Sequence, residues 1–276
     1  MIIDFHVHAF ADKIVERAME QLTKTVAEET EHLTQTADNM PCTNGTLSDL
    51  IVKMDKYSID KSVLLPIATK PSQQKIVNDW AKDSASDKII PFGSVHPDAK
   101  DAIDELERIK AMGLYGVKLH PDYQGFFVDE EHLFPIYEKC IELDLPIVFH
   151  AGFDPISPNV VHAMPDAFAR ILDRLPDITM ILAHFGGMLE WDMVEEHLIG
   201  REGNLYFDMS TVTGYLSDEQ AERMIKNHGA ERILFASDMP WDSPQNIKSL
   251  VERLDLSNDD RENILHKNAE KLLKIC

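Results

Sequence analysis

The chain opens with a short apolar run, residues 1–8 (MIIDFHVH), that carries two histidines at alternate positions. Successive side chains of a β-strand point to opposite faces, so His6 and His8 would point the same way from a strand here. Two imidazoles placed in this way can converge on one metal ion, at about 2.1 Å from each ring nitrogen for zinc. The alternative is a pair of half-buried strand histidines that bind nothing, because histidine is only intermediate in its preference for burial.

Further polar side chains stand at or just past the ends of later apolar runs: His96, Lys118, His120, His150, His184 and Asp238. One such histidine could be a core residue with satisfied hydrogen bonds. A whole set of imidazoles with a carboxylate is hard to explain in that way, because buried polar groups cost free energy unless they are paired. Neutral imidazole and carboxylate suit zinc, and also iron or manganese. The set therefore predicts a divalent metal site, with zinc as the preferred ion.

The most economical assignment places His6, His8, His150 and Asp238 around one ion, with a position left open for water. His184 then lies close to that water. The ion lowers the pKa of the water towards about 7 and polarises a carbonyl, while Asp238 or His184 takes the proton. This arrangement predicts metal-assisted hydrolysis of an ester, lactone or amide bond in a small molecule, with Asp238 and His184 as catalytic residues.

Four more side chains are candidates for substrate binding. His96 and His120 are expected to face the pocket without binding metal, and Lys118 is the one evident cation among these strand-end residues. Trp241, just beyond the last apolar run, could line the pocket or simply pack in a loop.

The candidate residues are distributed over a regular succession of apolar runs and helical segments. The eight apolar runs span residues 1–8, 62–67, 89–95, 116–120, 146–150, 179–184, 204–209 and 232–238. Helical segments are predicted over residues 48–57, 72–86, 98–112, 129–143, 166–175, 188–199, 218–227, 246–254 and 259–275. Parallel strands need a long crossover connection, so the alternation predicts parallel pairing with the helices outside.

Eight such strands close into a single (β/α)₈ TIM barrel, which commonly has about 250 residues. The 276 residues of this chain fit one such domain, although length alone also allows two. An open doubly wound sheet is the structural alternative, but it often carries a glycine-rich phosphate loop after the first strand, and none stands there. Catalytic groups of a barrel come from the carboxyl ends of its strands, so the candidate residues are expected to meet on one rim.

A long excursion, residues 9–45, separates the first apolar run from the next helix. Apolar residues recur every four positions over residues 11–30, which predicts an amphipathic helix, and residues 34–45 have the composition of a loop. In a barrel this segment emerges on the catalytic face. We therefore expect it to act as a lid or as a homodimer contact.

Composition excludes several classes of partner. Lys and Arg total 27 against 48 Asp and Glu, and a net charge of −21 repels nucleic acid and anionic lipid surfaces. No apolar run approaches the roughly 18 residues that suggest a membrane span. Cys42, Cys140 and Cys276 are widely spaced, which indicates reduced thiols rather than a disulfide framework. A cytoplasmic enzyme acting on a small molecule, without nucleic-acid or membrane partners, is the simplest interpretation.

Longer motifs around these residues resemble the amidohydrolase superfamily. Within it they are similar to the amidohydrolase-related metal-dependent hydrolases of the aminocarboxymuconate-semialdehyde decarboxylase and lactonase group. The motifs are DFHVH at residues 4–8, GVKLHP at 116–121, PIVFHAG at 146–152, LPDITMILAHFGG at 175–187, RILFASDMPW at 232–241 and NAEKLL at 268–273. They run the full length of the chain. Together they are specific for the superfamily but weak on substrate.

The resemblance implies roles for particular residues. In that family the first-strand histidines, the fifth-strand histidine and the eighth-strand aspartate hold the metal, which implies His6, His8, His150 and Asp238 here. The sixth-strand histidine binds a second metal in binuclear members and orients water or shuttles a proton in mononuclear ones, so His184 inherits both interpretations.

Lys118 bears on the number of ions. The sequence KLHP at residues 118–121 is similar to the KLYP of dihydroorotases, in which the lysine is carbamylated and bridges two metals. Lys118 and His184 are therefore candidates for a second metal. The alternative for Lys118 is a plain ammonium that binds an acidic substrate. One ion with an unmodified Lys118 is the preferred prediction, and two ions remain open.

Three functions follow from these residues. Hydrolysis by metal-bound hydroxide is preferred. The second is non-oxidative decarboxylation of a small unsaturated or aromatic acid, which needs a carboxylate anchor that is usually Arg. No Arg stands at the carboxyl end of a predicted strand, which favours hydrolysis. The third is a non-catalytic metal-binding barrel, which would be expected to have lost a ligand, and none is missing.

Overall fold

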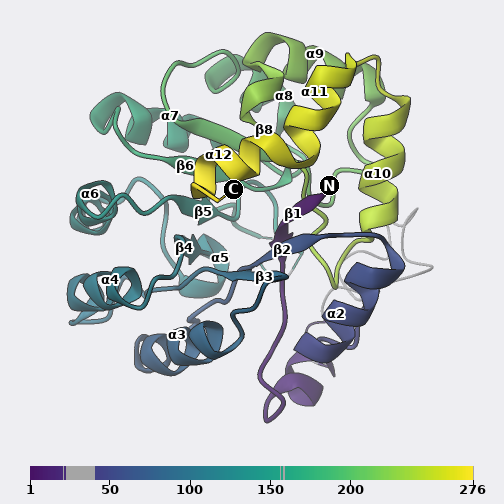
Figure 1. Ribbon diagram of the computed structural model, residues 1–276. Coiled ribbons are helices and arrows are strands. Elements are labelled where there is room, and N and C mark those ends of the chain that lie inside the picture. The colour runs from purple at the N-terminus through teal and green to yellow at the C-terminus, as the bar shows by residue number, and fades with distance from the viewer. Residues whose placement is uncertain (21, 23–40, 156, 158, 276) are drawn as a thin grey trace.

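The computed structural model describes residues 1–20, 22, 41–155, 157 and 159–275. Within this part of the chain, eight short strands alternate with helices (Figure 1). The strands are β1 (Ile3–Val7), β2 (Lys61–Leu64), β3 (Ile89–Pro91), β4 (Val117–Leu119), β5 (Ile147–Phe149), β6 (Met180–Leu182), β7 (Leu205–Asp208) and β8 (Ile233–Leu234). Their positions agree with the eight predicted apolar runs.

The strands pair in parallel, in two sheets of order β1-β2-β3 and β4-β5-β6-β7-β8. Isolated parallel bridges join the sheet edges, Val7 to Met239 on one side and Gly93 to Val117 on the other. A main-chain hydrogen bond of 2.8 Å from Phe5 N to the Phe235 carbonyl also links β1 to the β8 segment. The sheets thus form a ring, and the predicted (β/α)₈ barrel is confirmed.

Helices surround the ring (Figure 1). The α-helices that lie wholly within the described residues are α2 (Leu47–Lys56), α3 (Gln74–Asp83), α4 (Ala102–Ala111), α5 (Pro121–Gln124), α6 (Phe134–Glu142), α7 (Pro165–Arg174), α8 (Trp191–His197), α9 (Asp218–His228), α10 (Pro244–Arg253), α11 (Asn258–Glu262) and α12 (Asn268–Leu273). Shorter helical turns are η2 (Pro71–Gln73), η3 (Glu131–Leu133), η4 (His184–Gly186), η5 (Ala230–Arg232) and the π-helical η6 (Asn263–Lys267).

Several helices begin at side chains that cap their first turn. The Ser217 hydroxyl accepts from the Gln220 N–H ahead of α9, and Thr46 does the same for Asp49 ahead of α2. Ser257 and Asp260 form a reciprocal capping box at the start of α11. Each such cap satisfies a backbone N–H that has no partner within the helix and is typically worth about 1 kcal/mol.

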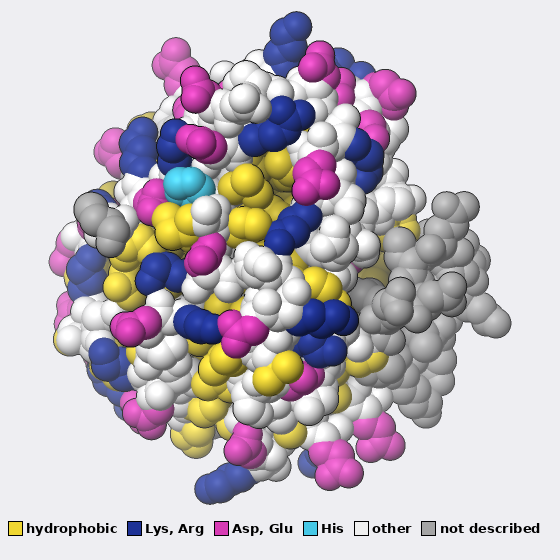
Figure 2. Space-filling view, turned by 45° about the vertical axis from the view of Figure 1, so that its right-hand side comes forward, with side chains coloured by type: hydrophobic (Ala, Val, Ile, Leu, Met, Phe, Trp, Pro, Cys, Tyr) yellow, Lys and Arg dark blue, Asp and Glu magenta, His cyan; other side chains and the backbone are white. Residues whose placement is uncertain are grey.

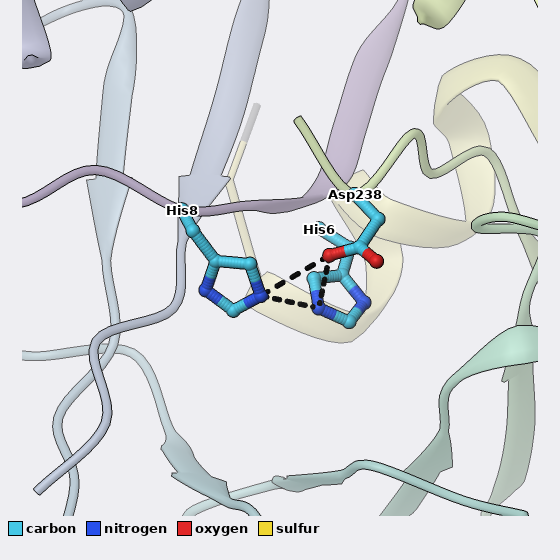
Figure 3. A group of neighbouring side chains, drawn as sticks. All are labelled: His6, His8 and Asp238. Atoms are coloured by element: carbon cyan, nitrogen blue, oxygen red, sulfur yellow. Dashed lines mark hydrogen bonds and ion pairs between the residues drawn. The ribbon is translucent and has the colours of Figure 1, made fainter. Parts of the chain in front are cut away.

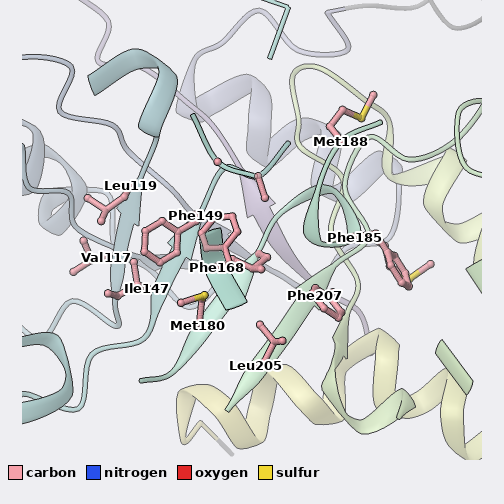
Figure 4. Close-up of a cluster of buried hydrophobic side chains, with 14 of the residues drawn as sticks. Val117, Leu119, Ile147, Phe149, Phe168, Met180, Phe185, Met188, Leu205 and Phe207 are labelled. Atoms are coloured by element: carbon pink, nitrogen blue, oxygen red, sulfur yellow. The ribbon is translucent and has the colours of Figure 1, made fainter. Parts of the chain in front are cut away.

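Apolar side chains of the strands fill two layers. One set packs outwards against the helices, as where Phe149 of β5 meets Phe168 of α7 with ring centroids 5.3 Å apart (Figure 4). The other set fills the barrel interior, where Phe5 and Phe92 pack edge to face at 5.9 Å. Leu273 of α12 belongs to this interior cluster, and α12 lies across the ring in Figure 1. The amino-terminal end of the barrel is therefore apolar and covered.

Hydrogen bonds join the two ends of the excursion after β1 to each other, and its second end to the loop after β8. Phe10 N donates to the Gly45 carbonyl at 2.8 Å, and Cys42 N donates to the Pro240 carbonyl at 2.8 Å. Residues 15–20 are helical, in agreement with the start of the predicted helix. Most of the segment for which a lid or dimer contact was predicted, residues 21 and 23–40, lies outside the described residues.

Charge is dispersed over the face in Figure 2, where Lys and Arg side chains lie among Asp and Glu side chains and form no single basic patch. None of the described helices has the length and apolar character needed to cross a membrane. Cys42 and Cys140 are free thiols.

Candidate active site

The carboxyl end of β1 and the loop after β8 bring three donor atoms together (Figure 3). His6 Nε2 lies 3.0 Å from His8 Nε2, and Asp238 Oδ1 lies 3.4 Å from the first and 3.2 Å from the second. A shift in the β1–β2 register between Asp4 and Val7 accompanies this convergence. Two imidazoles and a carboxylate are donors that divalent transition metals bind. We call His6, His8 and Asp238 the triad.

Hydrogen bonds fix which nitrogen each imidazole presents. His8 Nδ1 lies 2.8 Å from the Leu65 carbonyl, which can only accept, so the proton is on Nδ1 and the Nε2 lone pair faces the triad. His6 Nδ1 lies 2.8 Å from Asp208 Oδ2, which leaves its Nε2 for the triad in the same way. Burial lowers the pKa of His6 to about 4, with Lys118 adding to the effect and Asp208 opposing it. His6 is therefore neutral and able to act as a ligand.

Asp238 is held in place from both sides of the β1–β8 seam. Its N–H donates to the His6 carbonyl at 2.8 Å, and the Thr211 hydroxyl donates to its Oδ2 at 2.9 Å. The neighbouring Ser237 donates from N–H and hydroxyl to the buried Asp4 carboxylate, at 2.9 and 2.5 Å. Burial alone would raise the pKa of Asp238, but His6 and His8 outweigh it and hold that pKa well below its ordinary range.

His184 and His150 form the next part of the site. The Ser210 carbonyl lies 3.1 Å from His184 Nδ1, so this nitrogen carries the proton and Nε2 accepts from His150 Nδ1 at 3.1 Å. That leaves a lone pair on His150 Nε2, which is buried and has no hydrogen-bond partner among the described residues. Burial lowers the pKa of both histidines below the ordinary value.

His150, the fourth predicted ligand, belongs to a second donor group, with His120 and Asp154. Asp154 Oδ2 lies 3.6 Å from His120 Nε2 and 3.9 Å from His150 Nε2. The two imidazoles are stacked, with centroids 4.3 Å apart and planes 10° from parallel. Ring lone pairs lie in the ring plane, so two stacked rings cannot both direct them at one ion. The triad is the better candidate for a metal, and the assignment of His150 to that ion stays a prediction.

Lys118, at β4, places its ammonium inside this group of residues. Its Nζ lies 3.4 Å from His6 Nε2, and the side chain is 1% exposed. Burial lowers the pKa of Lys118 to about 8, against the opposing effect of Asp208 and Asp238. The side chain thus stays largely protonated at neutral pH. Among the residues that the structure describes, it is the one buried Lys or Arg.

The other predicted substrate-binding residues are placed differently. His120 is buried between the rings of Tyr123 and His150. His96 is buried, but its Nδ1 accepts from the Asp98 N–H at 3.2 Å, within its own loop. The half-buried Trp241 is joined to the site through its backbone, whose N–H donates to the Asp238 carbonyl at 2.7 Å.

Sequence reasoning missed three carboxylates of the site. Asp208 ends β7, Asp154 follows His150 by four residues, and Asp122 accepts from His162 Nδ1 at 2.8 Å. His162 pairs with this carboxylate, and only 17% of its side chain is exposed. Asp208 carried a usable signal, because it ends an apolar run as the other candidates do. The positions of Asp154 and Asp122 in the sequence gave no such signal.

Comparison with known proteins gives one family and several relatives. A family profile described as Amidohydrolase matches residues 3–275. The 2-amino-3-carboxymuconate-6-semialdehyde decarboxylase of Dictyostelium discoideum is 25% identical over 219 residues, which cover 67% of this chain and 61% of that protein. The gamma-resorcylate decarboxylase of a Polaromonas species is 24% identical over 221 residues, which cover 64% of this chain and 68% of that protein.

A solved structure shares the fold over the whole chain. It is 5-carboxyvanillate decarboxylase from Novosphingobium aromaticivorans, complexed with manganese and 4-hydroxy-3-methoxy-5-nitrobenzoic acid. The TM-score is 0.74 at 18% identity, with 100% of this chain and 96% of the other covered. At this identity the likeness demonstrates the common barrel.

These relatives overturn the preferred expectation of a hydrolase, since both sequence relatives are decarboxylases. Hydrolysis was favoured because no Arg stands at the carboxyl end of a predicted strand; among the described residues the one buried Lys or Arg is Lys118. The candidate metal donors do not distinguish the two reactions, because a divalent ion can assist either one. The superfamily itself was recognised correctly: with a profile match from residue 3 to residue 275, the chain belongs to the amidohydrolase family.

Proposed function

We propose that this protein removes the carboxyl group of a small unsaturated or aromatic acid, without oxidation, at a divalent metal site. The observation that carries the proposal is the Lys118 ammonium, buried 3.4 Å from His6 Nε2. A buried charge is costly unless it is paired, and an incoming carboxylate would complete that pairing. The decarboxylases among the sequence relatives support the same reaction.

We assign one ion to His6, His8 and Asp238, with His150 as the fourth ligand. The donor set fits such an ion, and the unpartnered His150 Nε2 gives a further buried lone pair. A bound divalent ion would supply positive charge that attracts substrate oxygens and stabilises negative charge as it develops. Zinc suits the imidazole-rich donors, and the manganese in the solved decarboxylase makes manganese the alternative.

The proposed reaction exchanges a carboxylate for a proton. The carbon–carbon bond to the carboxylate breaks, its electron pair stays on the substrate carbon, a proton joins that carbon, and carbon dioxide leaves. Lys118 would hold the anionic substrate, and an ammonium in a low-dielectric site does so more strongly than in water. We assign Asp238 and His184 as the catalytic residues that pass this proton to the substrate carbon. We propose that Lys118 is unmodified and that no second ion is needed.

A substrate panel tests the reaction. The protein, loaded in turn with zinc and with manganese, is incubated with hydroxylated benzoic acids and unsaturated dicarboxylic acids, and carbon dioxide release is measured. Asp238→Asn should abolish release while circular dichroism shows an intact fold. Turnover of lactones or amides, without carbon dioxide from any acid, would contradict the proposal, as would full activity of the variant.

We also propose a role for the segment after β1, as a lid over the site or as a contact between two copies of the chain. The Cys42 N–H donates to the carbonyl of Pro240, which follows Asp238 by two residues, so the second end of this segment lies beside the site. This supports a lid or a homodimer contact at residues 9–45, and sedimentation of a variant lacking residues 12–42 tests the dimer. A cytoplasmic location is supported by the free thiols of Cys42 and Cys140.

A further inference from the structure

The Asp208 carboxylate at the end of β7 is fully buried and contacts three separate parts of the site. Its Oδ2 lies 2.8 Å from His6 Nδ1. Its Oδ1 accepts from the His184 N–H at 3.1 Å, from the Ser210 N–H at 3.0 Å and from the Ser210 hydroxyl at 2.5 Å. One side chain thus joins the ends of β1, β6 and β7.

The partners of Oδ1 determine which oxygen of the carboxylate faces His6. Two backbone N–H groups and a hydroxyl all donate to it, so this oxygen can only be an acceptor. Oδ2 is then the atom that faces His6, and it accepts the proton of Nδ1. With that proton on Nδ1, the lone pair of His6 is on Nε2, which lies 3.0 Å from His8 Nε2.

The second arm of the contact reaches His184 through Ser210. His184 Nδ1 lies 3.1 Å from the Ser210 carbonyl and 3.0 Å from its hydroxyl oxygen. The same hydroxyl donates to Asp208 Oδ1. The carboxylate therefore fixes the serine, and the serine fixes the ring of His184.

We propose that Asp208 is a positioning residue: it sets the tautomer of His6 and, through Ser210, the orientation of His184. This goes beyond the proposed reaction, and it rests on that proposal only in taking the triad as the metal site. Hydrogen-bonded partners of metal-ligating histidines typically contribute about 10- to 100-fold to metal affinity.

An asparagine at this position is a sharp test because its two ends differ. The amide oxygen must take the place of Oδ1, since turning the amide round would set its NH₂ against two backbone N–H donors. The NH₂ group then faces His6 Nδ1 and donates to it. His6 must move its proton to Nε2, and the lone pair that faces the triad is lost.

The experiment compares the metal-free wild type with Asp208→Asn. Long-range ¹H–¹⁵N NMR of ¹⁵N-histidine-labelled protein reports the ring tautomer, with the His6 signal assigned by its loss in His6→Gln. We expect a proton on Nδ1 in the wild type and on Nε2 in the variant. Calorimetric titration with zinc, and cobalt(II) absorption as a spectroscopic check, should show affinity lower by about 10- to 100-fold.

Asp242→Asn is the matched control. Asp242 is also a buried carboxylate near the site, but its partners are Thr213 and Asn246 rather than a histidine. Its variant should keep the wild-type tautomer and zinc affinity. An unchanged His6 tautomer with zinc affinity within threefold of wild type in Asp208→Asn would overturn the proposal, and so would equal losses in both variants.

Two measurements keep the test decisive if Asp208→Asn does not fold. A wild-type His6 that carries its proton on Nε2 contradicts the proposal directly. Ser210→Ala removes the second arm and the 3.3 Å contact of the Ser210 hydroxyl with His6 Nδ1, but it keeps Asp208 Oδ2 as the acceptor at 2.8 Å. It should therefore shift the pH–rate profile and leave the His6 tautomer and zinc affinity unchanged; a lost tautomer there would contradict the assigned route. None of the binding readouts depends on decarboxylation, so an inactive wild type with the expected tautomer and affinities would refute only the proposed reaction.

Discussion

His6 and His8 present the same ring nitrogen to Asp238 because other acceptors occupy the opposite side of each ring. The Leu65 carbonyl takes one Nδ1 proton and Asp208 takes the other. The two Nε2 lone pairs that remain face the same place, beside Asp238 Oδ1. The Lys118 ammonium lies beside the same ring nitrogen of His6, 3.4 Å from Nε2.

Lys118→Met tests the carboxylate anchor. Loss of a hydrogen bond to a charged group costs about 1.5–3 kcal/mol, so kcat/KM for an acidic substrate should fall about 10- to 100-fold, with most of the change in KM. The fold should persist, because the variant removes a buried charge and keeps the volume of the side chain. Steady-state kinetics and thermal melting measure the two effects.

Lys139→Met is the control for this change. Lys139 lies on α6 and pairs with Glu107 and Glu142, away from the triad. Its variant should keep the wild-type KM. A Lys118→Met enzyme with an unaltered KM would remove the main support for a carboxylate bound at this ammonium.

The loops after the strands owe their paths to unusual backbone conformations. His184 and Asp238, at φ of 55° and 70°, lie in the left-handed region, where a non-glycine residue is uncommon. Gly152, two residues beyond His150, has φ of 81° and is bridged to Met188. A Cβ at Gly152 would lie 2.1 Å from the Met188 backbone nitrogen. The loops that carry His150 and His184 can approach each other only because this residue has no side chain.

Gly152→Ala should therefore destabilise the protein strongly. A left-handed alanine costs about 1–2 kcal/mol, and the clash with backbone adds about 1–3 kcal/mol. Gly125→Ala is the matched control, because Gly125 has a similar φ of 74° but no atom within 4 Å of its Cβ position. Urea unfolding of both variants gives the difference. Equal losses in the free energy of unfolding would show that the contact between Gly152 and the Met188 backbone does not limit the residue at position 152.

His228 at the end of α9 links pH to stability. It is buried, its Nε2–H donates to the Leu205 carbonyl and its Nδ1 accepts from the Gly200 N–H. Burial lowers the pKa of His228 to about 4, from an ordinary value of 6.5. Between these values the unfolded chain binds a proton that the folded protein does not, so the free energy of unfolding falls as pH drops from 6.5 towards 4, by up to about 1.4 kcal/mol per unit.

His228→Gln should lose the part of this pH dependence that comes from His228, so its slope should be lower than that of the wild type by up to about 1.4 kcal/mol per pH unit, while His132→Gln, at a more exposed histidine, should keep the wild-type slope. Urea unfolding in the presence of chelator at several values between pH 4 and 7 measures the slopes, and chelator keeps metal release out of the comparison. If the wild-type slope survives in His228→Gln, the titration of this residue is not its source.

At the scale of the whole molecule, the apolar cluster of the interior and the candidate active site occupy opposite ends of the barrel. Apolar side chains and α12 cover the amino-terminal end, and the triad stands at the carboxyl ends of the strands. Residues 6 and 238, at opposite ends of the sequence, become neighbours because β1 and the β8 segment are bonded together. A ligand that binds across this seam should stabilise the entire barrel.

Metal binding should accordingly raise the melting temperature. A ligand at 100 times its Kd stabilises the folded state by about 2.7 kcal/mol, which for a chain of this size corresponds to a rise of roughly 5–10 °C. Scanning fluorimetry with added zinc, manganese or chelator measures the shift. His8→Ala should abolish it, and a shift that survives in this variant would move the metal site elsewhere.

The sequence by itself determined the order of the strands, the barrel and most of the candidate residues at its rim. Periodicity and strand-end polarity are local, and they record burial along the chain directly. They predicted His6, His8, His150, His184, Lys118 and Asp238 at or just past strand ends, and the structure has these residues within or up to four residues after β1, β4, β5, β6 and β8. They also gave the amidohydrolase family, because its motifs are contiguous.

Only the tertiary structure decided how these residues meet. Closure of the ring at β1 and β8 brings the triad together. The partners of Asp208 come from the ends of three strands, and no spacing along the sequence predicts these contacts. Burial of Lys118 among the imidazoles likewise depends on the register of strands that are distant in sequence. Local pattern fixes where a side chain stands on its own strand, whereas the protonation, tautomer and charge on which a reaction depends are set by neighbours that only the folded chain brings into contact.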